Sequence, residues 1–310
     1  MLSIDYQRLN FHLSFEKSIQ FKNLPTFYFR SILGNELHRL VCLFKHRPCS
    51  SCALRFQCAY SYIFESPLHE ENSVLKGRNY ASHPFVLFTD VVPNTSVNKI
   101  NLSITLFGES RRFIPFVYLA IKNGGEHGIF KSRVKYAIKN VYIDEFIGLN
   151  KEGQIVIPPK TKTWTLKNED SEIKEGKVFI EFLSPFRYKK NGRLTEKISF
   201  DDVLLAIKRR IEILHGLYMK PQKILPIEFG HFDIQYSNTQ LQWTDYSRYS
   251  ARQKQAMRMG GITGILAVEG SFDSSIMQML KGAEIFHIGK NTSLGLGKIK
   301  FTYVERKQHD

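Results

Sequence analysis

Hydrophobic and polar residues alternate in some parts of this chain and follow a helical period in others. In the first half, four segments alternate or are apolar throughout, as strands are: 3–15, 84–92, 99–107 and 134–149. Two other segments, 25–44 and 111–122, repeat apolar residues at the spacing of one helix face. The predicted order is strand, helix, strand, strand, helix, strand, which is the order of a ferredoxin-like domain.

The second half repeats this order of elements. It follows 151–175, a stretch rich in Lys, Pro, Thr and Glu that predicts a linker. A helix is predicted from Ser199, a capping residue with acidic residues in the turn after it. The other predicted elements are strands at 176–183, 241–244, 261–268 and 299–304 and a short helix at 274–280. We therefore predict an α+β protein with two tandem ferredoxin-like domains, 1–150 and 176–310.

The helix predicted at 25–44 has two distinct faces. Its apolar stripe consists of Phe29, Leu33, Leu37, Leu40 and Phe44. At about 100° per residue, Tyr28, Asn35 and His38 lie on the opposite face. A phenol, an amide and an imidazole are therefore expected along one exposed side of this helix.

The net charge narrows the choice of partners. Lys plus Arg number 44 and Asp plus Glu number 29, which gives a formal charge of +15. This excess favours a nucleic acid or an anionic surface, although a merely basic enzyme is the alternative. With 43% hydrophobic and 24% charged residues, the chain is expected to form a packed core. No apolar run approaches the ~20 residues that span a bilayer, and the N-terminal residues lack a signal-peptide pattern, so we expect a cytoplasmic protein.

All four cysteines lie close together, with the spacing C-x6-C-x2-C-x5-C: Cys42, Cys49, Cys52 and Cys58. Disulfides are disfavoured in a reducing cytoplasm, so the cluster favours a metal site. Four thiolates suit a tetrahedral Zn ion or an iron–sulfur cluster. A closed shell of four ligands would hold the Cys-rich loop, 42–65, in place rather than take part in a reaction. No second CxxC pair completes the usual pattern, so a metal-free loop is the alternative.

A glycine-rich loop at 287–298 precedes the last predicted strand. It contains Gly289, Gly295 and Gly297 beside Lys290 and Lys298. Glycine allows backbone N–H groups to approach a phosphate closely, and lysine adds a positive charge. The loop matches neither the GxxxxGK[ST] spacing of a Walker A motif nor a GxGxxG that follows a strand and opens a helix. It predicts a loop that binds a polyanion, with a tight turn as the alternative.

Three blocks of sequence together resemble one family. They are LPTFYFRSILGNELHRLVC followed by CSSCALRFQCAYSYIFE, then WTDYSRYSARQKQAMRMGGITGIL, and finally HIGKNTSLGLGK. In this order they resemble the Cas6 family of CRISPR repeat-processing endoribonucleases, within the RAMP superfamily. The glycine-rich loop alone is shared with other RAMP proteins. The combination is more similar to Cas6 proteins of the cysteine-containing branch.

The resemblance implies two RRM/RAMP-type ferredoxin-like domains that bind CRISPR repeat RNA in precursor crRNA. It also implies metal-independent cleavage, in which the ribose 2′-OH attacks the adjacent phosphorus. The products are a 2′,3′-cyclic phosphate (or a 3′-phosphate) and a 5′-OH, and the reaction needs a base and an acid. The alternative is a non-catalytic RAMP subunit that binds RNA in a CRISPR effector complex. Without the resemblance, a zinc-stabilised nucleic-acid-binding module is a third hypothesis.

The resemblance places the catalytic histidine in the first helix or the loop after it, where His38 and His46 are the candidates. Tyr28 could act with them or could serve in packing, and His287 either takes part or orients the glycine-rich loop. For RNA binding we expect the loop and a basic, aromatic segment before it: Gly289, Lys290, Gly295, Gly297, Lys298, Arg248, Arg252 and Lys254. A solvated basic face is the alternative for the second group. A further basic run, 187–193, predicts a hairpin that contacts RNA.

Overall fold

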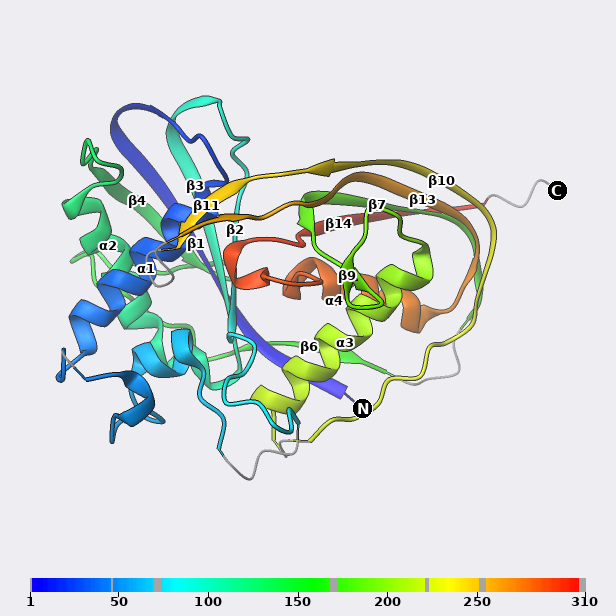
Figure 1. Cartoon of the computed structure of the whole chain (residues 1–310), viewed down its shortest axis with the longest axis horizontal. Coiled ribbons are helices and arrows are strands. Elements are labelled where there is room, and N and C mark those ends of the chain that lie inside the picture. Colours follow the sequence, from blue (N-terminus) through cyan, green and yellow to red (C-terminus); the bar gives the residue numbers. More distant parts are fainter. Residues whose placement is uncertain are drawn as a thin grey trace. The chain divides into compact units, whose positions relative to one another are not determined.

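The computed structural model describes residues 2–45, 47–69, 74–167, 172–220, 223–250 and 255–306 (Figure 1). The chain divides into two compact units. The N-terminal unit comprises Ile4–Thr163 and Gly216–Lys223, and the C-terminal unit comprises Met1–Ser3, Trp164–His215 and Ile224–Asp310. The predicted linker, 151–175, contains one strand and the start of the next, and its role as a linker stays a prediction.

The N-terminal unit is a ferredoxin-like fold. Its six principal elements are β1 (Leu2–Gln20), α1 (Pro25–Val41), β2 (Phe85–Thr89), β3 (Ser96–Phe107), α2 (Ile114–His127) and β4 (Tyr136–Ile143). The strands form an antiparallel sheet in the order β2-β3-β1-β4, extended by the short edge strand β5 (Phe146–Ile147), and β6 (Lys162–Leu166) pairs with β1. This order of strands and helices confirms the sequence-based prediction.

The alternation of apolar residues along β1 explains how this sheet forms its core. Leu9, Phe11 and Leu13 are fully buried, and their neighbours on β3 are buried apolar residues too, as in the pairs Leu9–Ile104 and Leu13–Ile100. Side chains that alternate in this way place one face of a strand in the core. Short helices complete the unit: η1 (Cys49–Ser51), the π-helical η2 (Ser61–Glu65) and η3 (Gly108–Phe113).

Helix α1 is shorter than predicted, and its buried face is narrower. It ends at Val41 because Cys42 adopts an extended conformation, with φ −80° and ψ 112°. Phe29, Leu33 and Leu37 are buried as expected. The predicted stripe was wrong at its C-terminal end, where Leu40 and Phe44 are 38% and 45% exposed. The Cys-rich loop therefore begins with exposed apolar residues.

The C-terminal unit repeats the same topology. Its main elements are β7 (Lys174–Phe186), α3 (Phe200–Tyr218), β10 (Phe232–Thr244), β13 (Gly261–Phe272), α4 (Ser274–Phe286) and β14 (Ile299–Glu305). The strands pair antiparallel in the order β10-β13-β7-β14. Two small hairpins are inserted, β8 (Lys189–Lys190) with β9 (Arg193–Leu194) and β11 (Ser247–Ser250) with β12 (Gln255–Arg258), and η4 (Thr292–Leu294) precedes β14.

Most elements of this unit are longer than their sequence patterns predicted. The predicted strand at 241–244 is the end of β10, and the predicted helix at 274–280 continues to Phe286. The predicted cap of α3 is confirmed, since Ser199 Oγ accepts from the Asp202 N–H at 3.3 Å and Asp202 Oδ2 accepts from the Ser199 N–H at 3.1 Å. No helix in the described ranges is long and apolar enough to cross a membrane.

Candidate functional site

His38 lies on the half-buried side of α1, and an aromatic ring contacts its imidazole. The ring of Tyr60, just before η2, packs edge-on against it with 4.7 Å between the ring centroids. An imidazole has an ordinary pKa near neutrality, so it can accept or donate a proton under physiological conditions. The contact with Tyr60 constrains the position of the His38 ring, and its catalytic role stays a prediction. His46, the other candidate, lies outside the described residues.

Tyr28, the third catalytic candidate, belongs to an aromatic cluster. Its ring packs edge-on against Phe21 and Phe130, with centroid distances of 5.4 and 5.2 Å. Such edge-to-face pairs contribute about 0.5–1.5 kcal/mol each beyond the area that they bury. The geometry gives Tyr28 a packing role, while its catalytic role stays a prediction.

The four cysteines are reduced and half-buried in the Cys-rich loop. Cys49 begins η1, and its carbonyl accepts from the Cys52 N–H at 3.2 Å, which closes the CxxC turn. Burial, the Glu65 carboxylate and the other three thiols raise the pKa of Cys49 to about 11. The other three thiols therefore disfavour ionisation of the Cys49 thiol. In the part of the chain that the structure describes, no three His, Cys, Asp or Glu side chains stand close enough together to hold a metal ion.

The glycine-rich loop is held by its own backbone hydrogen bonds. The N–H groups of Ile288 and Gly295 donate to carbonyls within the loop, those of Gly297 and Lys290 to Pro185 and Arg187, and that of Lys298 to the Ser184 hydroxyl. These N–H groups are therefore engaged in shaping the loop against the end of β7. Phosphate binding by the loop stays a prediction.

Close backbone approach explains why glycine occupies two of these positions. A Cβ on Gly297 would stand 1.8 Å from the Ile288 carbonyl oxygen, and one on Gly289 would stand 2.6 Å from that of Arg187. Both residues also have positive φ, at +71° and +79°. The two lysines differ: Lys290 is exposed, whereas Lys298 is half-buried and its Nζ donates to the Glu284 carbonyl.

Arg187 links the loop to the inserted β11–β12 hairpin, and sequence reasoning missed this link. Its carbonyl accepts from the Lys290 N–H at 3.0 Å, and its Nη1 donates to the Gly260 carbonyl at 2.6 Å. Burial lowers the pKa of the Arg187 guanidinium, partly offset by Asp245, and burial also lowers the pKa of Arg248 on β11. The other two basic candidates of this segment, Arg252 and Lys254, lie outside the described residues.

A buried carboxylate in α1 was also missed. Glu36 is 5% exposed, and its oxygens contact Arg39 Nη1 at 2.7 Å and His127 Nδ1 at 3.2 Å. The periodicity of α1 gave no sign of it, because His127 comes from the end of α2. The cluster ties the two helices of the N-terminal unit together.

Two family models match the chain. One, described as an N-terminal domain (AF_1859_N), matches residues 4–167. The other, the CRISPR-associated endoribonuclease Cas6, matches residues 180–299 and so includes the whole glycine-rich loop. No curated protein matches the chain in sequence.

Solved structures share the fold. A Cas6 product complex superposes with a TM-score of 0.54 at 14% identity, covering 95% of this chain and 98% of that chain. A partial Cas6-RT-Cas1–Cas2 complex gives a TM-score of 0.53 at 14% identity, covering 99% of this chain but 47% of that one. At this identity the similarity concerns the fold alone, and the fold agrees with the tandem ferredoxin-like architecture. The chain therefore carries an AF_1859_N domain followed by a domain, residues 180–299, that belongs to the Cas6 family of CRISPR-associated endoribonucleases.

Proposed function

We propose that this protein is a metal-independent endoribonuclease that cleaves CRISPR repeat RNA within precursor crRNA. The observation that carries the proposal is the match of residues 180–299 to the Cas6 endoribonuclease family. The formal charge of +15 supports an RNA partner, and a half-buried imidazole in α1 supports proton-transfer chemistry. The reaction would take place in the cytoplasm, where the precursor RNA is made.

The proposed reaction forms one bond and breaks one at the same phosphorus. A base removes the proton of the ribose 2′-OH while that oxygen attacks, and the P–O5′ bond breaks as an acid protonates the leaving oxygen. The products are a 2′,3′-cyclic phosphate, which can open to a 3′-phosphate, and a 5′-OH. His38 is our first candidate for a proton-transfer role, and His46 is the second. Arg248 and Lys290 are candidates to neutralise phosphate charge.

The test is cleavage in the presence of a chelator. Purified protein should cut a labelled repeat RNA in EDTA, because no step needs a divalent ion. Binding without cutting would contradict the enzymatic proposal. It would favour the alternative, a non-catalytic RAMP subunit that holds RNA beside other subunits of a CRISPR effector complex. Failure to bind RNA at low salt would contradict both proposals.

The Cys-rich loop is proposed to hold a structural Zn ion, or an iron–sulfur cluster. The chemistry of the donor set suits either, since four thiols lie in one loop, but among the described residues the side chains do not stand close enough together to hold an ion. Cys42, Cys49, Cys52 and Cys58 would be the ligands, and the metal would reverse the mutual repulsion of their thiolates. Its contribution would be to fold the loop, while the RNA chemistry stays with the side chains described above.

Elemental analysis tests the metal proposal independently of activity. Protein purified without chelator should contain about one equivalent of Zn, or the iron and sulfide of one cluster, per chain. The double variant Cys49→Ser with Cys52→Ser should lose it. Less than roughly 0.2 equivalents of metal in the wild type would contradict a structural site.

A further inference from the structure

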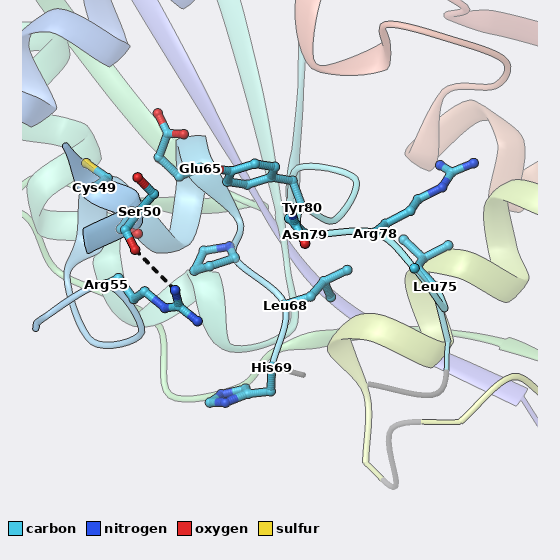
Figure 2. A pocket seen from close by; sticks show the side chains of 13 residues that line it. Cys49, Ser50, Arg55, Glu65, Leu68, His69, Leu75, Arg78, Asn79 and Tyr80 are labelled. Atoms are coloured by element: carbon cyan, nitrogen blue, oxygen red, sulfur yellow. Dashed lines mark hydrogen bonds between the residues drawn. The ribbon is translucent and has the colours of Figure 1, made fainter. Parts of the chain in front are cut away.

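A cavity of about 450 Å³ opens beside the Cys-rich loop, within the N-terminal unit. Its size falls in the range of about 300–1,000 Å³ that is typical of small-molecule sites. Figure 2 shows side chains of the Cys-rich loop on one side and those of the segment before β2 on the other, among them Ser50, Arg55, Leu75 and Tyr80. The cavity is distinct from the His38 ring and from the glycine-rich loop, and nothing in the proposed reaction uses it.

Ser61 places a buried hydroxyl group at the wall of this cavity. The residue is 2% exposed, and in the described ranges its buried Oγ has no hydrogen-bond partner. A buried hydroxyl without a partner costs about 1–3 kcal/mol, so such groups are rare unless a water, an ion or a ligand satisfies them. Since Ser61 lines the cavity, a ligand that enters it can supply the missing partner.

Arg55 adds a positive charge that is already held in place. Its Nη1 donates to the Ser50 carbonyl at 3.1 Å, and its Cζ stands 4.4 Å from the centroid of the Phe56 ring. Phe56 in turn stacks on His69, with 3.9 Å between centroids and 10° between planes. A guanidinium has five N–H donors, so the bond to Ser50 leaves others for a phosphate.

Tyr80 supplies an aromatic surface on the same cavity. The residue is 44% exposed and lines the cavity, so part of its surface is open to a flat ligand. An accessible aromatic ring near a fixed cation is the combination by which proteins hold unpaired nucleotides, with the base stacked and the phosphate paired. Each stacked base contributes about 1–3 kcal/mol.

We propose that this cavity binds a single ribonucleotide unit, with its phosphate at Arg55, its base against Tyr80 and a polar group bonded to Ser61. This proposal rests on the proposed function, because RNA bound to the protein would bring its nucleotides to the protein surface. The unit comes either from an unpaired position of the bound RNA strand or from a free nucleoside monophosphate. The chemistry of recognition is the same for both.

The first experiment compares two arginines of the same loop. Arg55 and Arg47 each lie over a phenylalanine ring, at 4.4 and 5.7 Å, but Arg55 lines the cavity and Arg47 does not. The affinity of the full chain for a short single-stranded RNA should fall about tenfold in Arg55→Ala and less than about twofold in Arg47→Ala. Tenfold corresponds to about 1.4 kcal/mol. Equal losses in the two variants would overturn the proposal, because general charge attraction would then explain them.

The second experiment uses the buried hydroxyl. In Ser61→Ala the melting temperature without ligand should stay the same or rise, because no hydrogen bond is lost. RNA affinity should nevertheless fall about threefold to fivefold. A fall in melting temperature with unchanged affinity would overturn the assignment. Titration with AMP, GMP, CMP and UMP identifies the source of the nucleotide. If these monophosphates raise the melting temperature of the wild type but not of Ser61→Ala or Arg55→Ala, the cavity binds free nucleotides. If they have no effect while RNA affinity still depends on both residues, the cavity binds a unit of the RNA strand.

Cleavage separates this proposal from the proposed function. If the wild type cuts repeat RNA in EDTA while Arg55→Ala and Ser61→Ala bind RNA as tightly as the wild type, the cavity is not a nucleotide site and the enzyme proposal stands. If binding depends on Arg55 and Ser61 but no RNA is cut, the nucleotide site stands and the enzyme proposal fails. If neither RNA nor any monophosphate binds, both fail.

Discussion

The two units of this protein share one topology but carry their distinctive chemistry in different connections. Both sheets follow the same ferredoxin-like strand order. In the N-terminal unit the long connection from α1 to β2 holds the cysteines and the cavity. In the C-terminal unit the notable connections are two hairpins and the glycine-rich loop between α4 and β14. Because the frameworks agree, the differences between the units lie in these insertions.

The two insertions are also stabilised in different ways. Side-chain contacts run through the Cys-rich loop and its surroundings, as between Arg55, Phe56 and His69 or between His38 and Tyr60. The glycine-rich loop is set by backbone hydrogen bonds and by glycines that allow close backbone approach. Substitution of these aromatic and basic side chains should therefore loosen the N-terminal insertion. In the C-terminal loop, substitution of the glycines should do so, because they allow the close backbone approach.

The largest effect is expected at His38. His38→Ala should reduce single-turnover cleavage of repeat RNA by about 10³-fold, because proton transfer by a positioned side chain contributes 10²–10⁴-fold. RNA affinity should stay within about twofold. His12→Ala is the matched control, since His12 is also a half-buried histidine of the N-terminal unit that packs on a tyrosine, Tyr142, at 5.2 Å. Full activity in His38→Ala with loss in His46→Ala would move the role to His46.

Next in size is the effect of a methyl group in the glycine-rich loop. Gly297→Ala should lower the free energy of unfolding by about 3 kcal/mol or more, because the new Cβ meets the Ile288 carbonyl. Gly192→Ala in the β8–β9 turn is the control. Gly192 also has positive φ, at +79°, but no heavy atom lies within 4 Å of its Cβ position, so it should cost about 1–2 kcal/mol. Equal costs in denaturant titrations would show that the loop tolerates the contact.

The two lysines of this loop should separate stability from binding. Lys298→Ala should lower the free energy of unfolding by about 1 kcal/mol, because its Nζ donates to the Glu284 carbonyl. Lys290→Ala should leave stability within about 0.5 kcal/mol and weaken RNA binding about threefold, with a shallower salt dependence. The reverse pattern would contradict the assignment of Lys290 to RNA.

The effect that is smallest at neutral pH is a pH dependence from Tyr62 of the N-terminal unit, because it appears only above pH 10. Burial raises the pKa of Tyr62 to about 12, with Arg112 lowering it in part. The unfolded phenol titrates near 10, so the stability from the neutral form is complete below pH 10 and is lost as the pH rises toward 12. Tyr62→Phe should therefore lose less stability than the wild type between pH 10 and 12 in denaturant titrations. Parallel pH profiles would refute the shift.

The order of elements was predictable because the longest strands and helices repeat their patterns over many residues. The alternation along β1 and the period of α1 left few other arrangements. The ends were not predictable, as at Cys42, whose extended conformation stops α1. The burial of Glu36 was also not predictable, because its partner His127 belongs to another helix. Contacts between distant segments are absent from any local pattern.

The candidate site was predictable in kind more than in geometry. Glycines between lysines indicated a specialised loop, but the hydrogen bond from Arg187 to the Gly260 carbonyl joins residues 73 positions apart in the sequence. The cysteine spacing indicated one cluster, and its metal stays a prediction. The cavity at Ser61 and Arg55 had no signal, because it forms between the Cys-rich loop and the segment before β2. His38 became a candidate through the family resemblance and its helix face, and its catalytic role stays a prediction.

The central claim is that a ribose 2′-OH of the RNA is the nucleophile, while the protein supplies the proton transfers. Replacing the single ribose before the mapped cut by 2′-deoxyribose tests this directly, in EDTA and with the wild-type protein. The account predicts that cleavage at this position stops while the affinity for the RNA stays within about twofold. Continued cleavage of the deoxy-substituted RNA at the same bond would contradict it, because the nucleophile would then come from elsewhere.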